Sequence, residues 1–324
     1  MKAALSSIAL VCALAGCGGD PEAPEQTPEQ AAGPSAVGPA AQTSGPIVLT
    51  PGFRVGESSV YVHEEISRQA QATSLHGLTR EIRELRRFRL ETVSVDDAGG
   101  AVLRLTMERV ASSVVDNGTP VFEFDSLVPA DDTSGQAKAR RILSGLIANI
   151  RVAPGGTVVT MAANLTPADL QGLPRDARVH LAENWFIAAI ESLYRPLGER
   201  SGVDVSQPWQ DSVAPGPPFT GDEHQLVTTA QVTEADDDRV EILAESQLYT
   251  SGEPIPEVYR QRARYRWSLT DGRLMSYDQT ERVAVEGTMV GVASAEVAER
   301  EISFRRINPP LPNVENPPVD TPGR

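Results

Sequence analysis

The sequence predicts an α+β fold in which antiparallel β-sheets pack against two or three central helices. Segments between 59 and 126 and between 225 and 307 alternate apolar and polar side chains with a period of two, a pattern typical of strands with one buried face. The segments between them carry apolar residues at helical spacing. The order strands, helices, strands favours α+β over an alternating α/β fold.

The strand pattern is clearest where Leu103, Leu105 and Met107 share one face and Arg104 and Thr106 share the other. The expected strands are 59–66, 101–107, 121–126, 157–161, 225–232, 239–249, 258–269, 273–285 and 301–307.

Three helices are expected between the two strand regions, over 136–150, 164–170 and 175–193. Thr166 can cap the second helix and Pro167 can occupy its first position. Pro196 ends the third helix, since proline cannot continue one.

The N-terminus combines one lysine, a short apolar stretch and the residues LAGC, which end at Cys17. An apolar stretch this short fits a secretory signal rather than a membrane-spanning helix. The LAGC sequence resembles the lipobox of bacterial lipoproteins. The resemblance implies a signal peptide over 1–16, cleavage between Gly16 and Cys17, and acyl chains such as palmitate on Cys17. The alternative is an ordinary signal peptide with a chance cysteine.

An acylated Cys17 would anchor the protein in a membrane without spanning it, because two or three acyl chains hold far more firmly than one. Cys12 lies in the segment that would be removed, so no disulfide or cysteine nucleophile is expected. In the lipoproteins that the lipobox resembles, an aspartate directly after the cysteine favours the inner membrane. Here Gly18 and Gly19 follow, which favours the outer membrane with the domain facing the periplasm.

Residues 17–46 are rich in Pro, Ala and Gly and are expected to form a disordered tether of roughly 30 Å. A disordered proline-rich tail is expected over 308–324. The globular domain is then 47–307. The formal net charge is −15, or −16 without Lys2, which argues against nucleic acid as a partner.

The domain divides into candidate halves, 47–161 and 203–307, joined by the helical segment 162–202. The residues RFRL at 87–90 resemble RYRW at 264–267, and the tripeptide ERV occurs at 108–110 and 281–283. Either the halves derive from a duplication, which predicts two similar sheets, or arginine-rich strands resemble each other by chance.

No catalytic, cofactor or metal motif is found. His63-Glu64-Glu65 begins like a zinc-protease helix, but Ser67 stands where the second histidine is required. The chain lacks the G-x-S-x-G motif of serine hydrolases and the glycine-rich loops that hold phosphates or dinucleotides. The acidic run at 236–238 is typical of a solvated hairpin turn rather than a calcium loop.

The candidate binding residues are four arginines that alternate along one expected strand, Arg260, Arg262, Arg264 and Arg266. Period-two spacing places all four on one face. Two interpretations stay open. The arginines either form cross-strand ion pairs with Glu241 and Glu245, or they bind an anionic group such as a carboxylate, phosphate or acidic glycan.

The sequence VFEFDS at 121–126, followed by a helix and a P-x-G turn, is similar to uncharacterised bacterial envelope lipoproteins, and the expected architecture resembles periplasmic lipoprotein carriers. These resemblances imply a non-enzymatic, lipid-anchored module that binds an apolar small molecule or an envelope protein or glycan, with no cofactor. The alternative is an extracytoplasmic hydrolase with dispersed catalytic residues.

Overall fold

The computed structural model describes residues 47–73, 77–128, 132–171, 173, 183–194, 202–214, 224–255, 257–289 and 292–307. Its strands are β1 (Ile47–Val48), β2 (Ser58–Thr73), β3 (Gly77–Val95), β4 (Ala101–Asp116), β5 (Thr119–Asp125), β6 (Ile147–Val152), β7 (Val158–Ala163), β8 (Gly202–Val203), β9 (Trp209–Val213), β10 (His224–Ala235), β11 (Arg239–Thr250), β12 (Glu253–Pro254), β13 (Tyr259–Ser268), β14 (Arg273–Met289) and β15 (Val292–Ile307). The helices are α1 (Gly135–Ser144), α2 (Pro167–Leu170) and α4 (Glu183–Tyr194).

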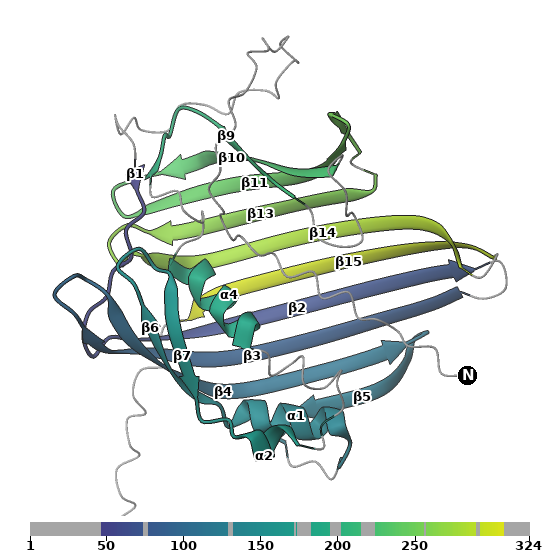
Figure 1. Ribbon diagram of the computed structural model, residues 1–324, viewed down its shortest axis with the longest axis horizontal. Coiled ribbons are helices and arrows are strands. Elements are labelled where there is room, and N and C mark those ends of the chain that lie inside the picture. Colours follow the sequence, from purple (N-terminus) through teal and green to yellow (C-terminus); the bar gives the residue numbers. More distant parts are fainter. Residues whose placement is uncertain are drawn as a thin grey trace, which may run out of the picture.

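One antiparallel sheet of 13 strands dominates the fold (Figure 1). Its strands follow the order β7-β6-β4-β3-β2-β15-β14-β13-β11-β10-β9, with β5 beside β4 and β12 beside β11. The first and last long strands, β2 and β15, pair near the centre of the order, so the two ends of the domain lie side by side within the sheet. The short strands β1 and β8 form a separate pair.

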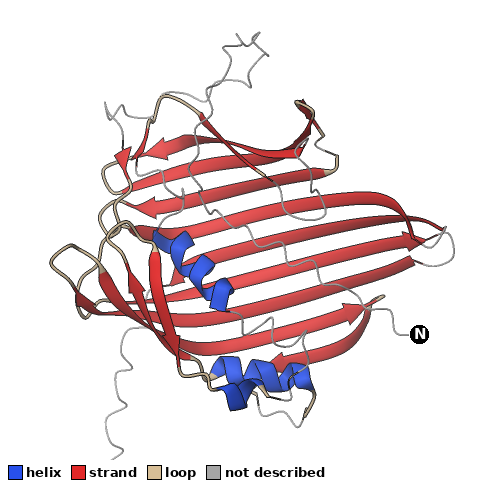
Figure 2. Cartoon of the chain, in the orientation of Figure 1, coloured by secondary structure: helices blue, strands red, loops and turns tan. Residues whose placement is uncertain are grey.

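The α+β prediction is wrong, because the described chain is mostly antiparallel sheet with few helical residues (Figure 2). The expected helix over 136–150 ends at Ser144, where Gly145 caps it. Residues 147–152 instead form β6, in which exposed and buried residues alternate. Leu146 and Ile150 fit a helical spacing and a strand spacing equally well, whereas Ile147 fits only the helical one and is exposed in β6. Gly145, which ends the helix, decides the outcome.

The individual strand predictions are confirmed, since each of the expected segments coincides with or lies within an observed strand to within one or two residues. The start of the third expected helix, 175–182, lies outside the described residues, and α4 covers its second half. The regions 1–46 and 308–324 also lie outside them, so the signal peptide, Gly16, Cys17, the tether and the tail stay predictions.

The core lies on one face of the sheet, which we call the inner face; α1 and α4 lie on this face and cover part of it (Figure 1). Tyr61, Phe88 and Phe304, from three neighbouring strands, pack with ring centroids 5.5 to 5.9 Å apart. Leu143 of α1 and Phe186 of α4 are at most 1% exposed against this face. The opposite face, which we call the outer face, carries the alternate residues of each strand.

The chain preceding β2 is fixed to the turn between β13 and β14. Gly52 N–H donates to the carbonyl oxygen of Gly272 at 2.9 Å, and Gly272 has a left-handed φ of +61°. Arg273, which is 3% exposed, donates to Glu57 at 2.6 Å and to the Gly52 carbonyl at 3.1 Å. A side chain at position 272 would collide with the Gly52 backbone, so this close approach requires glycine.

The hairpins that suggested a duplication, β3–β4 and β13–β14, lie in the same sheet, so the expectation of two sheets is wrong. Each hairpin contains a register shift, between Arg87 and Phe88 and between Arg266 and Trp267. The duplication itself stays a prediction.

Candidate functional site

The four alternating arginines lie on β13 and project from the outer face, where all four are exposed. Residues of opposite parity on the same strand, such as Trp267, are buried in the core. Because side chains alternate between the two faces of a strand, β13 presents its arginines to solvent and its apolar side chains to the core.

Three of these arginines contact glutamates of the neighbouring strand β11. Arg266 Nε lies 2.8 Å from Glu241 Oε2, and Arg264 Nε lies 3.5 Å from the other oxygen of that carboxylate. Arg262 Nε lies 3.3 Å from Glu245 Oε1. Burial alone would raise the pKa of Glu241, but hydrogen bonds from Arg266 and Thr233 and the charge of Arg264 lower it.

A depression of about 520 Å³ lies beside these ion pairs on the outer face and spans β2, β15, β14, β13 and β11. Short side chains, Ser303 and Thr280, line it on the two central strands. Longer side chains surround them, and Ile66 and Leu243 add apolar surface. The charged residues of the lining are Glu64, Arg262, Arg264, Asp278, Glu301 and Arg305.

The charges in the depression are incompletely satisfied by one another. Arg305 approaches Asp278 at 3.5 Å, and Glu301 pairs with Arg68 outside the depression. Glu64 is exposed and has no ion pair or hydrogen bond in the described part of the chain. Guanidinium groups beside carboxylates and hydroxyls offer both donors and acceptors to a ligand.

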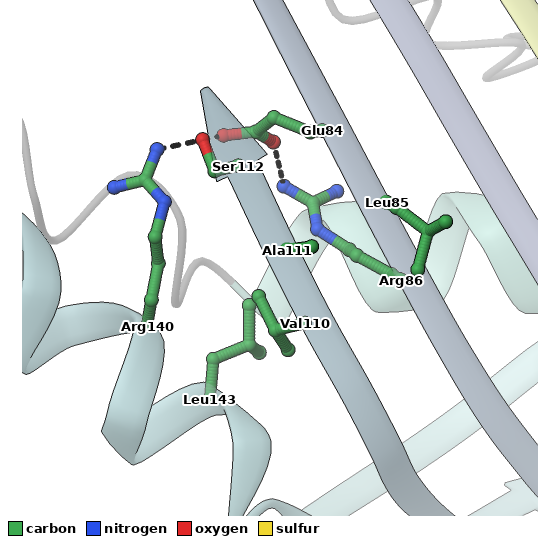
Figure 3. A pocket seen from close by; sticks show the side chains of 8 residues that line it. All are labelled: Glu84, Leu85, Arg86, Val110, Ala111, Ser112, Arg140 and Leu143. Atoms are coloured by element: carbon green, nitrogen blue, oxygen red, sulfur yellow. Dashed lines mark hydrogen bonds and ion pairs between the residues drawn. The ribbon is translucent and has the colours of Figure 1, made fainter. Parts of the chain in front are cut away.

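A second charged cluster is buried between the inner face and α1 (Figure 3). Glu84 of β3 accepts from Arg86 at 2.5 Å and from Arg140 of α1 at 3.0 Å. Arg140 also lies 4.8 Å from the centre of the Phe122 ring and is 3% exposed. The hollow that Glu84, Arg86 and Arg140 line leaves no room for a water molecule, so this cluster is a packed ionic contact rather than a cleft.

Further buried ionisable groups lie along the same face on β2, β15 and β14. His63 is 6% exposed, and burial together with the nearby Arg86 lowers its pKa to about 3. Burial raises the pKa of Glu281 against the opposing effect of Arg300. The pKa of Glu65 is lowered because Arg300, at 2.8 Å, outweighs the effect of burial.

Sequence reasoning missed this buried cluster, although a signal was present. Glu84 and Arg86 have the same parity as Phe88 and Leu90, so they continue the apolar face of β3 toward its beginning. His63 and Glu65 continue the face of Tyr61 in the same way. His63-Glu64-Glu65 lies on strand β2, as its alternation predicts.

The described residues contain no group of three or more His, Cys, Asp or Glu side chains placed to hold a metal ion. Within the same residues, no helix has the length and apolar character needed to cross a membrane.

No protein-family model matches the chain, and no curated protein matches it. Among solved structures, it is similar to a structure described as "Lipid-protein interactions in lipovitellin", with 11% identity over 79% of this chain, 25% of that chain and a TM-score of 0.44. The chain thus spans a quarter of the lipovitellin chain.

DynF from the dynemicin pathway of Micromonospora chersina matches with 8% identity over 84% of this chain and 90% of its own, at a TM-score of 0.17. The COG4313 outer membrane channel of Pseudomonas putida F1 matches with 11% identity over 79% of this chain and 97% of its own, at a TM-score of 0.21. At these scores the similarities carry no argument about what this chain binds.

Proposed function

We propose that the protein is a lipid-anchored binding module of the cell envelope, attached through Cys17 to the outer membrane, and that its outer face binds an acidic glycan. The observation that carries the proposal is the depression of about 520 Å³ lined by Arg262, Arg264 and Arg305. A concave site with converging polar groups is the usual form of a ligand site.

The chemistry of the lining favours a ligand that has both acidic groups and hydroxyls. Arginine recognises carboxylate and phosphate oxygens with paired hydrogen bonds. The carboxylates of Glu64 and Asp278 accept hydrogen bonds from hydroxyls, and Ser303 and Thr280 can donate or accept. The mixture suits an acidic sugar better than a purely anionic or a purely apolar molecule.

The inner face is less suited to a carried ligand. The side chains where α1 and α4 meet the sheet, including Leu143, Ile190 and Trp267, are at most 1% exposed. These side chains are shielded from solvent, as core side chains are.

The proposal is tested with the acylated full chain in detergent and with oligosaccharides of uronic acid as the probe. We expect saturable binding by calorimetry, and at least tenfold weaker binding by the double variant Arg262→Gln/Arg264→Gln. A neutral glucose oligosaccharide of equal length should not bind.

The matched control is Arg104→Gln/Arg151→Gln, which removes the same charge from exposed outer-face positions on β4 and β6, away from the depression. This variant should bind as the wild type does. Equal losses in both double variants would show general electrostatic attraction, and the proposal would fail. It would also fail if the wild type bound the neutral oligosaccharide as tightly.

A further inference from the structure

Two arginines stand directly opposite each other on neighbouring strands next to the depression. Arg260 of β13 is the cross-strand partner of Arg282 of β14, and both side chains are on the outer face. Residues paired in this way have Cβ atoms about 5 Å apart, and like charges directly opposite each other destabilise a sheet.

The charges of this pair are poorly compensated by the protein. Arg282 Nε lies 3.9 Å from Glu299 Oε1, and both side chains are about half exposed, at 50% and 51%. Arg260 has no ion pair or hydrogen bond in the part of the chain that the structure describes. On β11 its cross-strand neighbour is the neutral Gln247.

A second pair of directly opposed arginines lies on the same face, and there carboxylates compensate both positive charges. Arg87 and Arg109 are also directly opposite each other. Each of them has its own carboxylate, with Arg87 2.8 Å from Glu108 and Arg109 2.6 Å from Asp125. In the Arg260–Arg282 pair, Arg282 has only the long contact with Glu299 and a hydrogen bond of 3.4 Å to the carbonyl oxygen of Glu257. Arg260 has no carboxylate partner among the described residues, so the pair keeps capacity for an anion.

The position of the pair connects it to the depression. Arg262 and Thr280, which line the depression, are the next outer-face residues along β13 and β14. A ligand that fills the depression and extends by one residue pair along these strands would place an acidic group between the two guanidinium groups.

We infer that Arg260 and Arg282 form a subsite for an oxyanion, a carboxylate or phosphate group carried by the ligand of the depression. This inference rests on the proposed function. Each guanidinium can direct two parallel N–H donors at two oxygens of such a group. The two positive charges favour a doubly charged phosphate over a singly charged carboxylate.

The experiment follows the arginine Nε–H signals of the acylated full chain, labelled with ¹⁵N-arginine, by NMR in detergent. The probes are glucose 1-phosphate, glucuronate and glucose. We expect the signals of Arg260 and Arg282, assigned with the variants Arg260→Gln and Arg282→Gln, to shift saturably with either acidic sugar. If glucose 1-phosphate saturates these shifts at a lower concentration than glucuronate, the subsite prefers phosphate, and the reverse order shows a preference for carboxylate. Glucose should produce no shift.

Arg87 and Arg109 provide the internal control, because the same geometry with local carboxylates should leave their signals unmoved. Urea denaturation provides a second measurement that is independent of NMR. Glucose 1-phosphate should raise the denaturation midpoint of the wild type and of Arg87→Gln, because a ligand that binds the folded state stabilises it. It should not raise the midpoint of Arg260→Gln. The inference is overturned if all four signals shift alike or without saturation. If Arg260→Gln/Arg282→Gln binds uronate oligosaccharides normally while Arg262→Gln/Arg264→Gln does not, the subsite is wrong and the proposed function stands.

Discussion

Replacing Glu84 with glutamine is expected to lower the free energy of unfolding by about 3 to 5 kcal/mol, the usual cost of breaking a buried ion pair. The carboxylate of Glu84 pairs with both Arg86 and Arg140, whose side chains are only 6% and 4% exposed. Glutamine has nearly the same shape but no charge, so two guanidinium groups would remain buried beside a neutral amide. Urea denaturation at pH 7 measures the loss.

Glu108 provides a matched control on the outer face, because it also joins two arginines, Arg87 at 2.8 Å and Arg89 at 2.7 Å. Those arginines are 35% and 46% exposed, so water screens them when the carboxylate is removed. Glu108→Gln should therefore cost less than about 1 kcal/mol. Equal losses at positions 84 and 108 would contradict the role assigned to burial. If Glu84→Gln does not fold, adding Arg140→Met, which removes one of the two positive charges that Glu84 contacts, should restore folding.

Acidification is expected to destabilise the protein through His63. Its pKa is about 3 in the folded chain, against 6.5 for an ordinary histidine. The unfolded chain therefore binds a proton more readily, and stability that is present above pH 6.5 is lost as the pH falls toward 3. At about 1.4 kcal/mol per pH unit, roughly 2 to 3 kcal/mol should be lost to this group between pH 7 and pH 4.5.

Carboxylates such as Glu65, whose pKa is lowered, contribute to acid destabilisation in the same direction. The share of His63 is isolated by comparing the wild type with His63→Gln, which keeps a polar side chain that does not titrate. In urea curves at pH 7, 6, 5 and 4.5, the free energy of unfolding of the wild type should fall by roughly 2 to 3 kcal/mol more than that of His63→Gln. Parallel pH profiles would show that the pKa of His63 is the same in the folded and the unfolded chain, which contradicts the prediction.

The sequence predicts the strands well because period two is a strong local signal, but it does not predict how they assemble. Residues 101–107 show buried and exposed faces without ambiguity, and they lie in β4 as expected. The pairing of β2 with β15 joins residues more than 200 positions apart, and no local pattern encodes it. The expectation of several sheets with central helices failed for this reason.

The arginine surface was predictable, and the buried cluster was harder to see. Four arginines at alternate positions are a clear pattern in residues 260–266, whereas Glu84 and Arg86 are two of six charged residues between 80 and 87. Only the register with β2 and β4 shows that these two face the core side. The depression depends on Thr280 of β14 and Ser303 of β15 being diagonal neighbours, which likewise requires the register.

The most direct test of the central claim, that the outer face contacts an envelope component, is the reactivity of individual arginines toward phenylglyoxal. Intact envelopes of cells that produce the full chain are compared with the purified protein, and modified peptides are quantified by mass spectrometry. We expect Arg262 and Arg264 to react more slowly in envelopes, while the exposed Arg104 and Arg151 react equally in both. Equal reactivity of Arg262 and Arg264 in the two preparations would contradict the claim, and so would protection of all four arginines alike.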